Sequence, residues 1–242
     1  MAAAAAIPSA PFSNARRPCC NGAVTRFRDR ADAGRQLAAK LDGYARRPDV
    51  VVLGLPRGGV PVAFEVAREL EVPLDVFVVR KLGVPGHEEL AMGAIATGGA
   101  RVLNEEVVGR LGISADTVEA AARREADEVA RREQLYRGDR PPPDVRGRTV
   151  ILVDDGLATG ASMRAAVAAL RQHEPDRIVV AVPAAASETC AGLREDVDEI
   201  VCLLTPEPFV AVGFWYENFS QIGDDQVREL LERAAAVESG RT

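Results

Sequence analysis

The stretch of sequence that decides the fold is Thr149-Val150-Ile151-Leu152-Val153-Asp154-Asp155-Gly156-Leu157-Ala158-Thr159-Gly160-Ala161-Ser162. Its first five residues are mostly apolar and β-branched, which is typical of a strand buried on both faces of a parallel sheet. Two acids and a glycine then end the strand, and the apolar spacing over residues 162–172 predicts a helix. The stretch therefore predicts a strand, a tight turn and a helix in direct succession.

A second unit of the same kind precedes it in the chain. Residues 50–55 are short, apolar and β-branched, Gly58 and Gly59 break the run, and Pro61 opens a helix at the position where proline is favoured. Further strands are expected over residues 74–79, 177–182 and 200–204, with helices over 187–194 and from 224 onward. Alternating strands and helices predict an α/β protein with a doubly wound, mainly parallel sheet and helices on both faces.

Composition narrows the class of protein. The chain has 242 residues, of which 47% are hydrophobic and 27% charged, so one full core is feasible. The formal net charge of −6 argues against a broad nucleic-acid surface. The longest apolar runs fall short of the ~18 residues that a membrane helix needs, so no membrane association is expected. Cys19, Cys20, Cys190 and Cys202 lack zinc-site spacing, which favours reduced cysteines and a cytoplasmic location over a disulfide framework.

The two strand–turn–helix units predict two anion sites. Unpaired N–H groups of each turn and first helical turn converge on one point, which suits a phosphate. In open parallel sheets these points lie along one edge, at the carboxyl ends of the strands. Neither turn has a Walker A or Gly-x-Gly-x-x-Gly pattern, so a nucleoside-triphosphatase or a nicotinamide enzyme is not favoured.

The second turn carries the chemistry. Asp154 and Asp155 can hold sugar hydroxyls or a hydrated Mg²⁺, whereas Thr159, Ser162 and the backbone amides can hold a phosphate. A sugar phosphate satisfies both groups at once. The alternative is an acidic turn that only caps the following helix.

Residues 150–162 resemble the 5-phosphoribosyl-1-pyrophosphate (PRPP) signature of the type I phosphoribosyltransferases, which consists of four apolar residues, two acids, a glycine, then Thr-Gly and a Ser or Thr. The resemblance implies that Asp154 and Asp155 face the ribose hydroxyls and hold Mg²⁺ indirectly, through ribose or water. It also implies a 5-phosphate site formed by Ala158, Thr159, Gly160, Ala161 and Ser162.

The wider pattern is similar to the family over about residues 24–235. The resemblance implies a pyrophosphate site made by Arg57, Gly58 and Gly59 together with Arg80 and Lys81. Residues 82–100 lie where the family has a mobile loop that closes over the reaction. The alternatives are a surface role for Arg57 and a solvated strand end at Arg80 and Lys81.

The resemblance also organises the rest of the chain. Residues 1–23, which are basic and free of acids, are expected to be a disordered or targeting-like extension. The domain then spans 24–242, with a helical insertion over about 104–138, whose charged helix at 114–136 is expected to expose its charged face, and a small hood over about 205–242. Phe209 or Trp215 of the hood is the candidate for stacking on a base, and packing in an aromatic core is the alternative.

The implied function is a Mg²⁺-dependent phosphoribosyltransferase of the nucleotide-salvage kind, a homodimer that moves the 5-phosphoribosyl group of PRPP to a nitrogenous base and releases pyrophosphate. Arg57, Lys81, Asp154 and Asp155 are the expected catalytic residues. Purine and pyrimidine acceptors both stay open, although residues 182–186 lack the lysine with which 6-oxopurine enzymes read the base. The alternatives are a PRPP-sensing regulator without turnover and a phosphatase with a nucleophilic aspartate.

Overall fold

The computed structural model describes residues 26–239, so the predicted extension over residues 1–23 lies outside the described part. Eight strands form two sheets in this part: β1 (Val50–Gly54), β2 (Leu74–Val76), β3 (Val79–Val84), β4 (His87–Ala96), β5 (Arg101–Leu103), β6 (Thr149–Val153), β7 (Arg177–Ala184) and β8 (Glu199–Leu204). The α-helices are α1 (Arg30–Ala38), α2 (Gly59–Leu70), α3 (Glu105–Arg110), α4 (Ala115–Arg137), α5 (Ala161–Arg171), α6 (Ser187–Leu193) and α7 (Asp224–Ser239). None of the helices between residues 26 and 239 is both long enough and apolar enough to cross a membrane.

The larger sheet is parallel throughout and has the strand order β2-β1-β6-β7-β8. The chain runs outward from β1 to β2 and then returns to the other side of β1 to add β6, β7 and β8. The order therefore reverses between β1 and β6. Folds with this order place their ligand crevice at that switch point.

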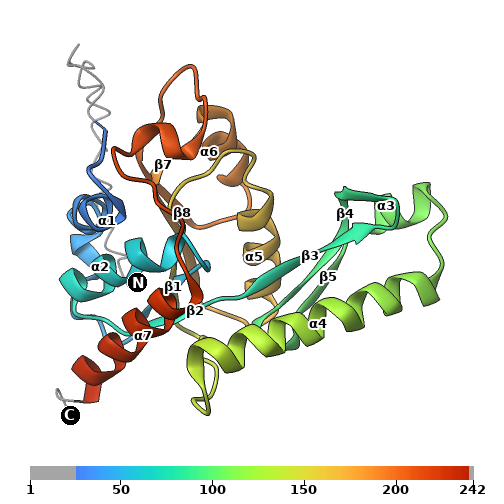
Figure 1. The fold of residues 1–242 in the computed structure, drawn as a ribbon, viewed down its shortest axis with the longest axis horizontal. Helices are drawn as coiled ribbons and strands as arrows, with labels where there is room; N and C mark the ends of the chain where they lie inside the picture. Colours follow the sequence, from blue (N-terminus) through green and yellow to red (C-terminus); the bar gives the residue numbers. More distant parts are fainter. Residues whose placement is uncertain (1–25, 240–242) are drawn as a thin grey trace, which may run out of the picture.

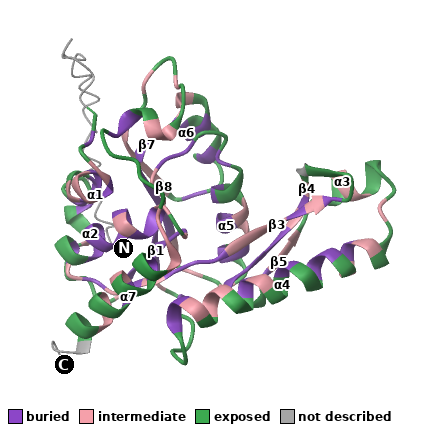
Figure 2. Cartoon of the chain, viewed as in Figure 1, coloured by how far each residue is buried: buried purple, intermediate pink, exposed green. Residues whose placement is uncertain are grey.

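Helices cover both faces of this sheet, as the sequence predicts (Figure 1). Alternate strand residues point to opposite faces: Val50 and Val52 join one core with α1, α2 and α7, whereas Val51 and Leu53 join the other with α5 and α6. In Figure 2 the central strands β1, β6 and β7 are buried, the edge strand β8 is intermediate, and the outer helix surfaces are exposed. The predicted doubly wound α/β fold is confirmed.

The region after β2 corrects two predictions. The strand expected over residues 74–79 ends at Val76, and Val79 begins β3 of a separate antiparallel sheet with the order β3-β4-β5. At the junction the Phe77 amide still donates to Gly54 of the first sheet at 3.1 Å, whereas the Val78 amide donates to the Thr97 hydroxyl at 2.9 Å. Residues 82–100, expected as a mobile loop, are therefore mostly paired strand. Strands β4 and β5 form an antiparallel hairpin in which Ala94 pairs with Val102.

This second sheet and α4 form an arm that projects from the main body (Figure 1). Helix α4 begins after Ser114, whose hydroxyl accepts from the Thr117 amide at 3.2 Å and so caps the helix. One face of α4 is buried and includes Val118, Glu125 and Val129. The charged Glu125 is therefore buried, whereas the sequence predicts an exposed charged face.

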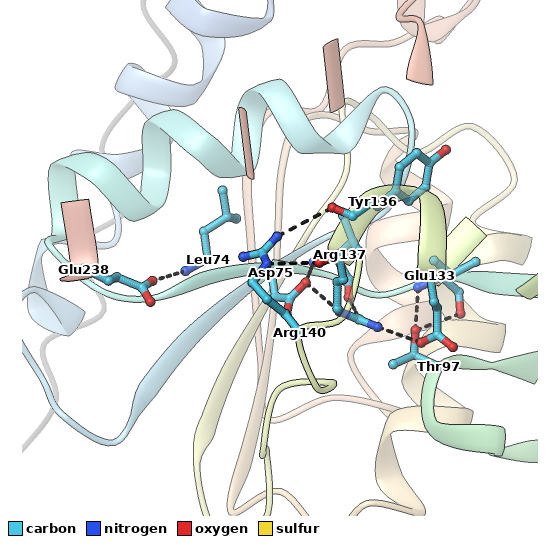
Figure 3. A network of polar contacts seen from close by, with 10 residues as sticks. Leu74, Asp75, Thr97, Glu133, Tyr136, Arg137, Arg140 and Glu238 are labelled. Carbon is cyan, nitrogen blue, oxygen red and sulfur yellow. Dashed lines mark hydrogen bonds and ion pairs between the residues drawn. The ribbon is translucent and has the colours of Figure 1, made fainter. Parts of the chain in front are cut away.

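The end of α4 is fixed to the main sheet by a buried ion-pair network (Figure 3). The Arg137 side chain is 3% exposed, and its Nε lies 2.9 Å from the Asp75 carboxylate. The same guanidinium donates to Glu133 at 2.8 Å and to the Val76 carbonyl at 2.7 Å. Since Asp75 and Val76 belong to β2, the network sets the position of the arm relative to the sheet.

One prediction about the cysteines is wrong. Cys190 of α6 and Cys202 of β8 are paired as a disulfide, although the sequence favours reduced cysteines. The two lie 12 residues apart in sequence, and α6, which carries Cys190, packs against β8, which carries Cys202. The sequence spacing carries no signal for this packing.

We expect Arg137→Met to destabilise the protein by about 3–5 kcal/mol, because the change leaves the buried Asp75 carboxylate without its cation. Urea unfolding followed by circular dichroism measures this. The control is Arg110→Met on α3, where the Arg110–Glu106 pair is 75% exposed on both sides and contributes little. Equal shifts for the two variants would contradict the structural role of the network.

Candidate functional site

The switch point brings the two predicted turns together. Gly54 at the end of β1 pairs with Val153 at the end of β6, and the Leu55 amide donates to the Val153 carbonyl at 2.9 Å. The turn that carries Arg57 and Gly58 therefore lies beside the acid pair that follows β6. The peptide bond between Pro56 and Arg57 is cis.

Gly58 allows the two turns to touch. A Cβ built at this position would overlap the Asp155 carboxylate, so no larger residue fits without movement of that side chain. The Gly58 backbone is in the right-handed helical region, with φ −61° and ψ −33°. The glycine is thus needed for close approach and not for its backbone conformation. Gly59, the first residue of α2, is buried against the Val153 carbonyl in the same way.

A cleft of about 440 Å³ opens at this junction. It combines the first turn, the acid pair, one residue of α1 and the segment that precedes α7. Its lining residues are Arg30, Pro56, Arg57, Gly58, Asp154, Asp155, Phe219, Ser220, Gln221 and Ile222. Arg57 is exposed and forms no ion pair with any residue between 26 and 239, so its charge is available to a bound anion.

The acid pair lies at the base of the cleft in a weakly solvated environment. The Asp154 carboxylate accepts the Asp155 amide at 2.8 Å. Burial raises the pKa of Asp154 well above its usual range, and the neighbouring Asp155 charge adds to this rise. Burial also raises the pKa of Asp155, while Arg30 acts in the opposite direction. Such a pair is stabilised by ligands that bring hydroxyl donors or positive charge.

Arg30 is a site residue that the sequence analysis missed. It is the first residue of α1 and 8% exposed, and its Nε and Nη2 both lie 2.8 Å from Oδ2 of Asp155. The partners are 125 residues apart in sequence, and no local pattern links them. The helix start at Asp29, whose side chain accepts from the Asp32 amide, is the only signal that could have drawn attention to this position.

The second turn continues into α5 with the features of an anion site. Gly160 is the N-cap of α5 and adopts φ 70°, a left-handed conformation that favours glycine. It offers no side-chain cap, and Ala158, Thr159, Ala161 and Ser162 are exposed. The start of this 11-residue helix is thus exposed, as a phosphate site requires, and the Ala161 amide donates to the Thr159 hydroxyl at 3.4 Å.

The Thr189 hydroxyl of α6 donates to the Ala158 carbonyl at 2.6 Å and holds this turn in place.

Gly59 and residues 158–162 do not line the cleft, and the structure places four further predicted site residues outside its lining as well. The side chain of Arg80 pairs with Glu125 of α4 at 3.0 Å. Lys81 lies on β3 and forms no ion pair within residues 26–239. Trp215 is 5% exposed and packs 6.4 Å from Phe209, ring centre to ring centre, in a buried aromatic cluster. The aromatic side chain that lines the cleft is instead that of Phe219.

By its strand order and its crevice, the protein is a doubly wound α/β protein with a ligand cleft at the switch point. A family model described as the phosphoribosyl transferase domain matches residues 21–216. The chain belongs to this family, and the resemblance to the type I phosphoribosyltransferases is confirmed.

Named relatives agree with this assignment. Two Mycobacterium tuberculosis proteins that carry the name "Putative phosphoribosyl transferase" are 50% identical over 208 residues, which cover 86% of this chain and 47% of theirs. The chain thus spans about half the length of these relatives. A uracil phosphoribosyltransferase from Lactobacillus gasseri is 36% identical over 86 residues, 34% of this chain and 41% of that protein.

A solved structure shares the fold over most of its length. The crystal structure of TT1426 from Thermus thermophilus is 44% identical in sequence, with a TM-score of 0.78. The match covers 86% of this chain and 99% of that one. The similarity therefore extends over nearly the whole of that protein.

We expect Gly58→Ala to destabilise the fold by about 1–3 kcal/mol, because the added methyl group displaces the Asp155 carboxylate. The control is Gly109→Ala on α3, where a Cβ meets nothing within 4 Å and alanine is the better helix former. The two variants should shift the urea midpoint in opposite directions. A Gly58→Ala protein as stable as wild type would show that the turns are not tightly packed.

Proposed function

We propose that this domain is a Mg²⁺-dependent phosphoribosyltransferase that transfers the 5-phosphoribosyl group of PRPP to a nitrogenous base and releases pyrophosphate. The observation that supports it best is the position of the acid pair, between an exposed arginine turn and an open helix N-terminus on neighbouring strands. One doubly phosphorylated sugar fits that order of groups: pyrophosphate at Arg57, ribose at the acids, and 5-phosphate at residues 158–162.

The donor groups in the cleft fit a magnesium ion that is shared with the substrate. Within residues 26–239 no group of three or more His, Cys, Asp or Glu side chains could hold a metal alone. Asp154 and Asp155 offer carboxylate oxygens, which Mg²⁺ prefers, and this ion usually completes its shell with water and substrate phosphates. When bound, Mg²⁺ would neutralise the charge of the leaving pyrophosphate.

The side chains of the cleft have distinct roles in this proposal. The bond between the anomeric carbon and pyrophosphate breaks as a base nitrogen attacks the same carbon, and positive charge develops on the sugar. Asp154 and Asp155 orient the ribose hydroxyls and favour that charge. Arg57 and the Gly58 amide would bind the pyrophosphate, whereas the Gly59 amide already donates to the Leu55 carbonyl at 3.0 Å. Because the base attacks the anomeric carbon directly, no covalent enzyme intermediate is required.

The remaining predicted residues keep their proposed roles with adjustments. Lys81 would reach the pyrophosphate from β3, whereas Arg80 would first have to leave Glu125. Phe219 is better placed than Phe209 or Trp215 to contact an acceptor ring, because only Phe219 lines the cleft. The acceptor class, purine or pyrimidine, follows from the assay below.

A homodimer and a cytoplasmic location stay predictions of the family resemblance and the sequence.

The test is a panel assay with purified protein, Mg²⁺, PRPP and a range of nucleobases, read out as pyrophosphate release. We expect base-dependent release with at least one acceptor. Calorimetry with PRPP alone runs in parallel. Binding of PRPP without turnover on any base would overturn the transferase and support a PRPP-sensing regulator. A phosphoenzyme on Asp154 would support the phosphatase alternative.

We expect Asp155→Asn to lower the turnover about 100-fold or more, because one electrostatic contact to the reacting sugar is lost. Asp139→Asn, at an exposed acid outside the cleft, is the matched control and should retain wild-type turnover. Wild-type turnover in the Asp155→Asn protein would remove the acid pair from the mechanism.

Removal of Mg²⁺ with a chelator should reduce pyrophosphate release to the background rate, and re-addition of Mg²⁺ should restore it. Circular dichroism of the protein with the chelator is the control, because an unchanged spectrum shows that the loss of activity does not come from unfolding. Full turnover without divalent cations would contradict the shared-metal site.

A further inference from the structure

Arg30 joins three parts of the chain at the cleft. Its Nε and Nη2 bind Oδ2 of Asp155 at 2.8 Å, and its Nη1 donates to the Ser220 carbonyl at 2.8 Å. Its guanidinium also lies 3.9 Å from the centre of the Phe219 ring. A residue of α1 thus binds the acid pair and the cleft-lining segment at 219–222 at the same time.

The contacts leave one oxygen of Asp155 available. Both nitrogens of Arg30 bind Oδ2, and Oδ1 accepts no hydrogen bond from any residue between 26 and 239. The guanidinium therefore fixes the orientation of the carboxylate without occupying the oxygen that can face a ligand. A planar, multi-donor guanidinium can do this, whereas an ammonium group cannot make the same set of contacts.

The backbone near Arg30 reinforces the link to the hood. The Phe27 amide donates to the Trp215 carbonyl at 2.9 Å, and the Glu217 amide donates to the Phe27 carbonyl at 2.8 Å. The Tyr216 hydroxyl donates to the Asp155 carbonyl at 2.6 Å. Arg30 is therefore the side-chain part of a connection between α1, the hood and the acid pair.

We propose that Arg30 is a positioning residue for PRPP, which holds Asp155 in the orientation that binds ribose and seats the segment at 219–222 against it. The inference rests on the proposed function, because it assigns the ribose to the acid pair. It adds a residue from α1 to a site otherwise built from the turns after β1 and β6 and the segment at 219–222. It also means that ribose binding and the position of the cleft wall are coupled through one guanidinium.

The experiment is a double-mutant cycle on PRPP affinity, measured by calorimetry with the full chain and Mg²⁺. We expect Arg30→Gln to raise the dissociation constant at least tenfold, and Asp155→Asn to do the same. If Arg30 acts through Asp155, the double variant should bind PRPP about as tightly as the weaker-binding single variant, because both changes remove the same Arg30–Asp155 contact. Arg30→Lys should recover part of the affinity.

The matched control is Arg35→Gln, which lies on the same helix and pairs loosely with Asp32 at 3.9 Å and Glu65 at 3.7 Å. It should bind PRPP as the wild type does. Amide hydrogen exchange over residues 217–220, measured without any ligand, should quicken in Arg30→Gln and not in Arg35→Gln. This readout tests the hood contact even if the activity assay fails.

Three outcomes would overturn the inference. The first is a dissociation constant of Arg30→Gln for PRPP within twofold of wild type. The second is a double variant whose loss of affinity equals the product of the two single losses, because Arg30 would then act independently of Asp155. If wild-type protein does not bind PRPP, the proposed function fails together with the inference. The first two results leave the proposed function intact, so the failures are distinguishable.

Discussion

The structure depends on the parallel pairing of β1 with β6. These strands are separated by about a hundred residues of sequence, and their register sets Gly54 against Val153. Because both strands end at the same edge, their turns must share one region of space, and the small size of Gly58 lets them come into contact there. This strand pairing brings Arg57 beside Asp154 and Asp155, which no local sequence motif could do by itself.

Electrostatics then determines how the assembled groups are held. Burial at the strand end raises the pKa of both Asp154 and Asp155, and the charge of Asp155 adds to the rise at Asp154. Arg30 offsets part of this cost at Asp155 and is itself held by Phe219 and the Ser220 carbonyl. The hood is thus attached to the body through the same charges that the site uses.

Much of this arrangement follows from the sequence. The two strand–turn–helix units have short apolar strands and glycine turns, patterns that report on local structure directly, and the parallel edge rule then brings the turns together. Other features have no local signature. The apolar run at 74–79 would suit either sheet, and its division after Val76 coincides with contacts to Thr97, which lies about twenty residues further along the chain. Likewise the Arg30–Asp155 and Cys190–Cys202 pairs depend on tertiary packing.

The long helix α4 connects distant parts of the molecule mechanically. Its 23 residues make a rod of about 34 Å, which runs from the tip of the arm to the main body. At the body end the Tyr136 hydroxyl binds Asp224 at 2.5 Å, two residues after the cleft-lining Ile222. Because α4 packs on β3 and β4 along the arm and on α7 at the body, one helix joins the antiparallel sheet to the element that directly follows the cleft-lining segment.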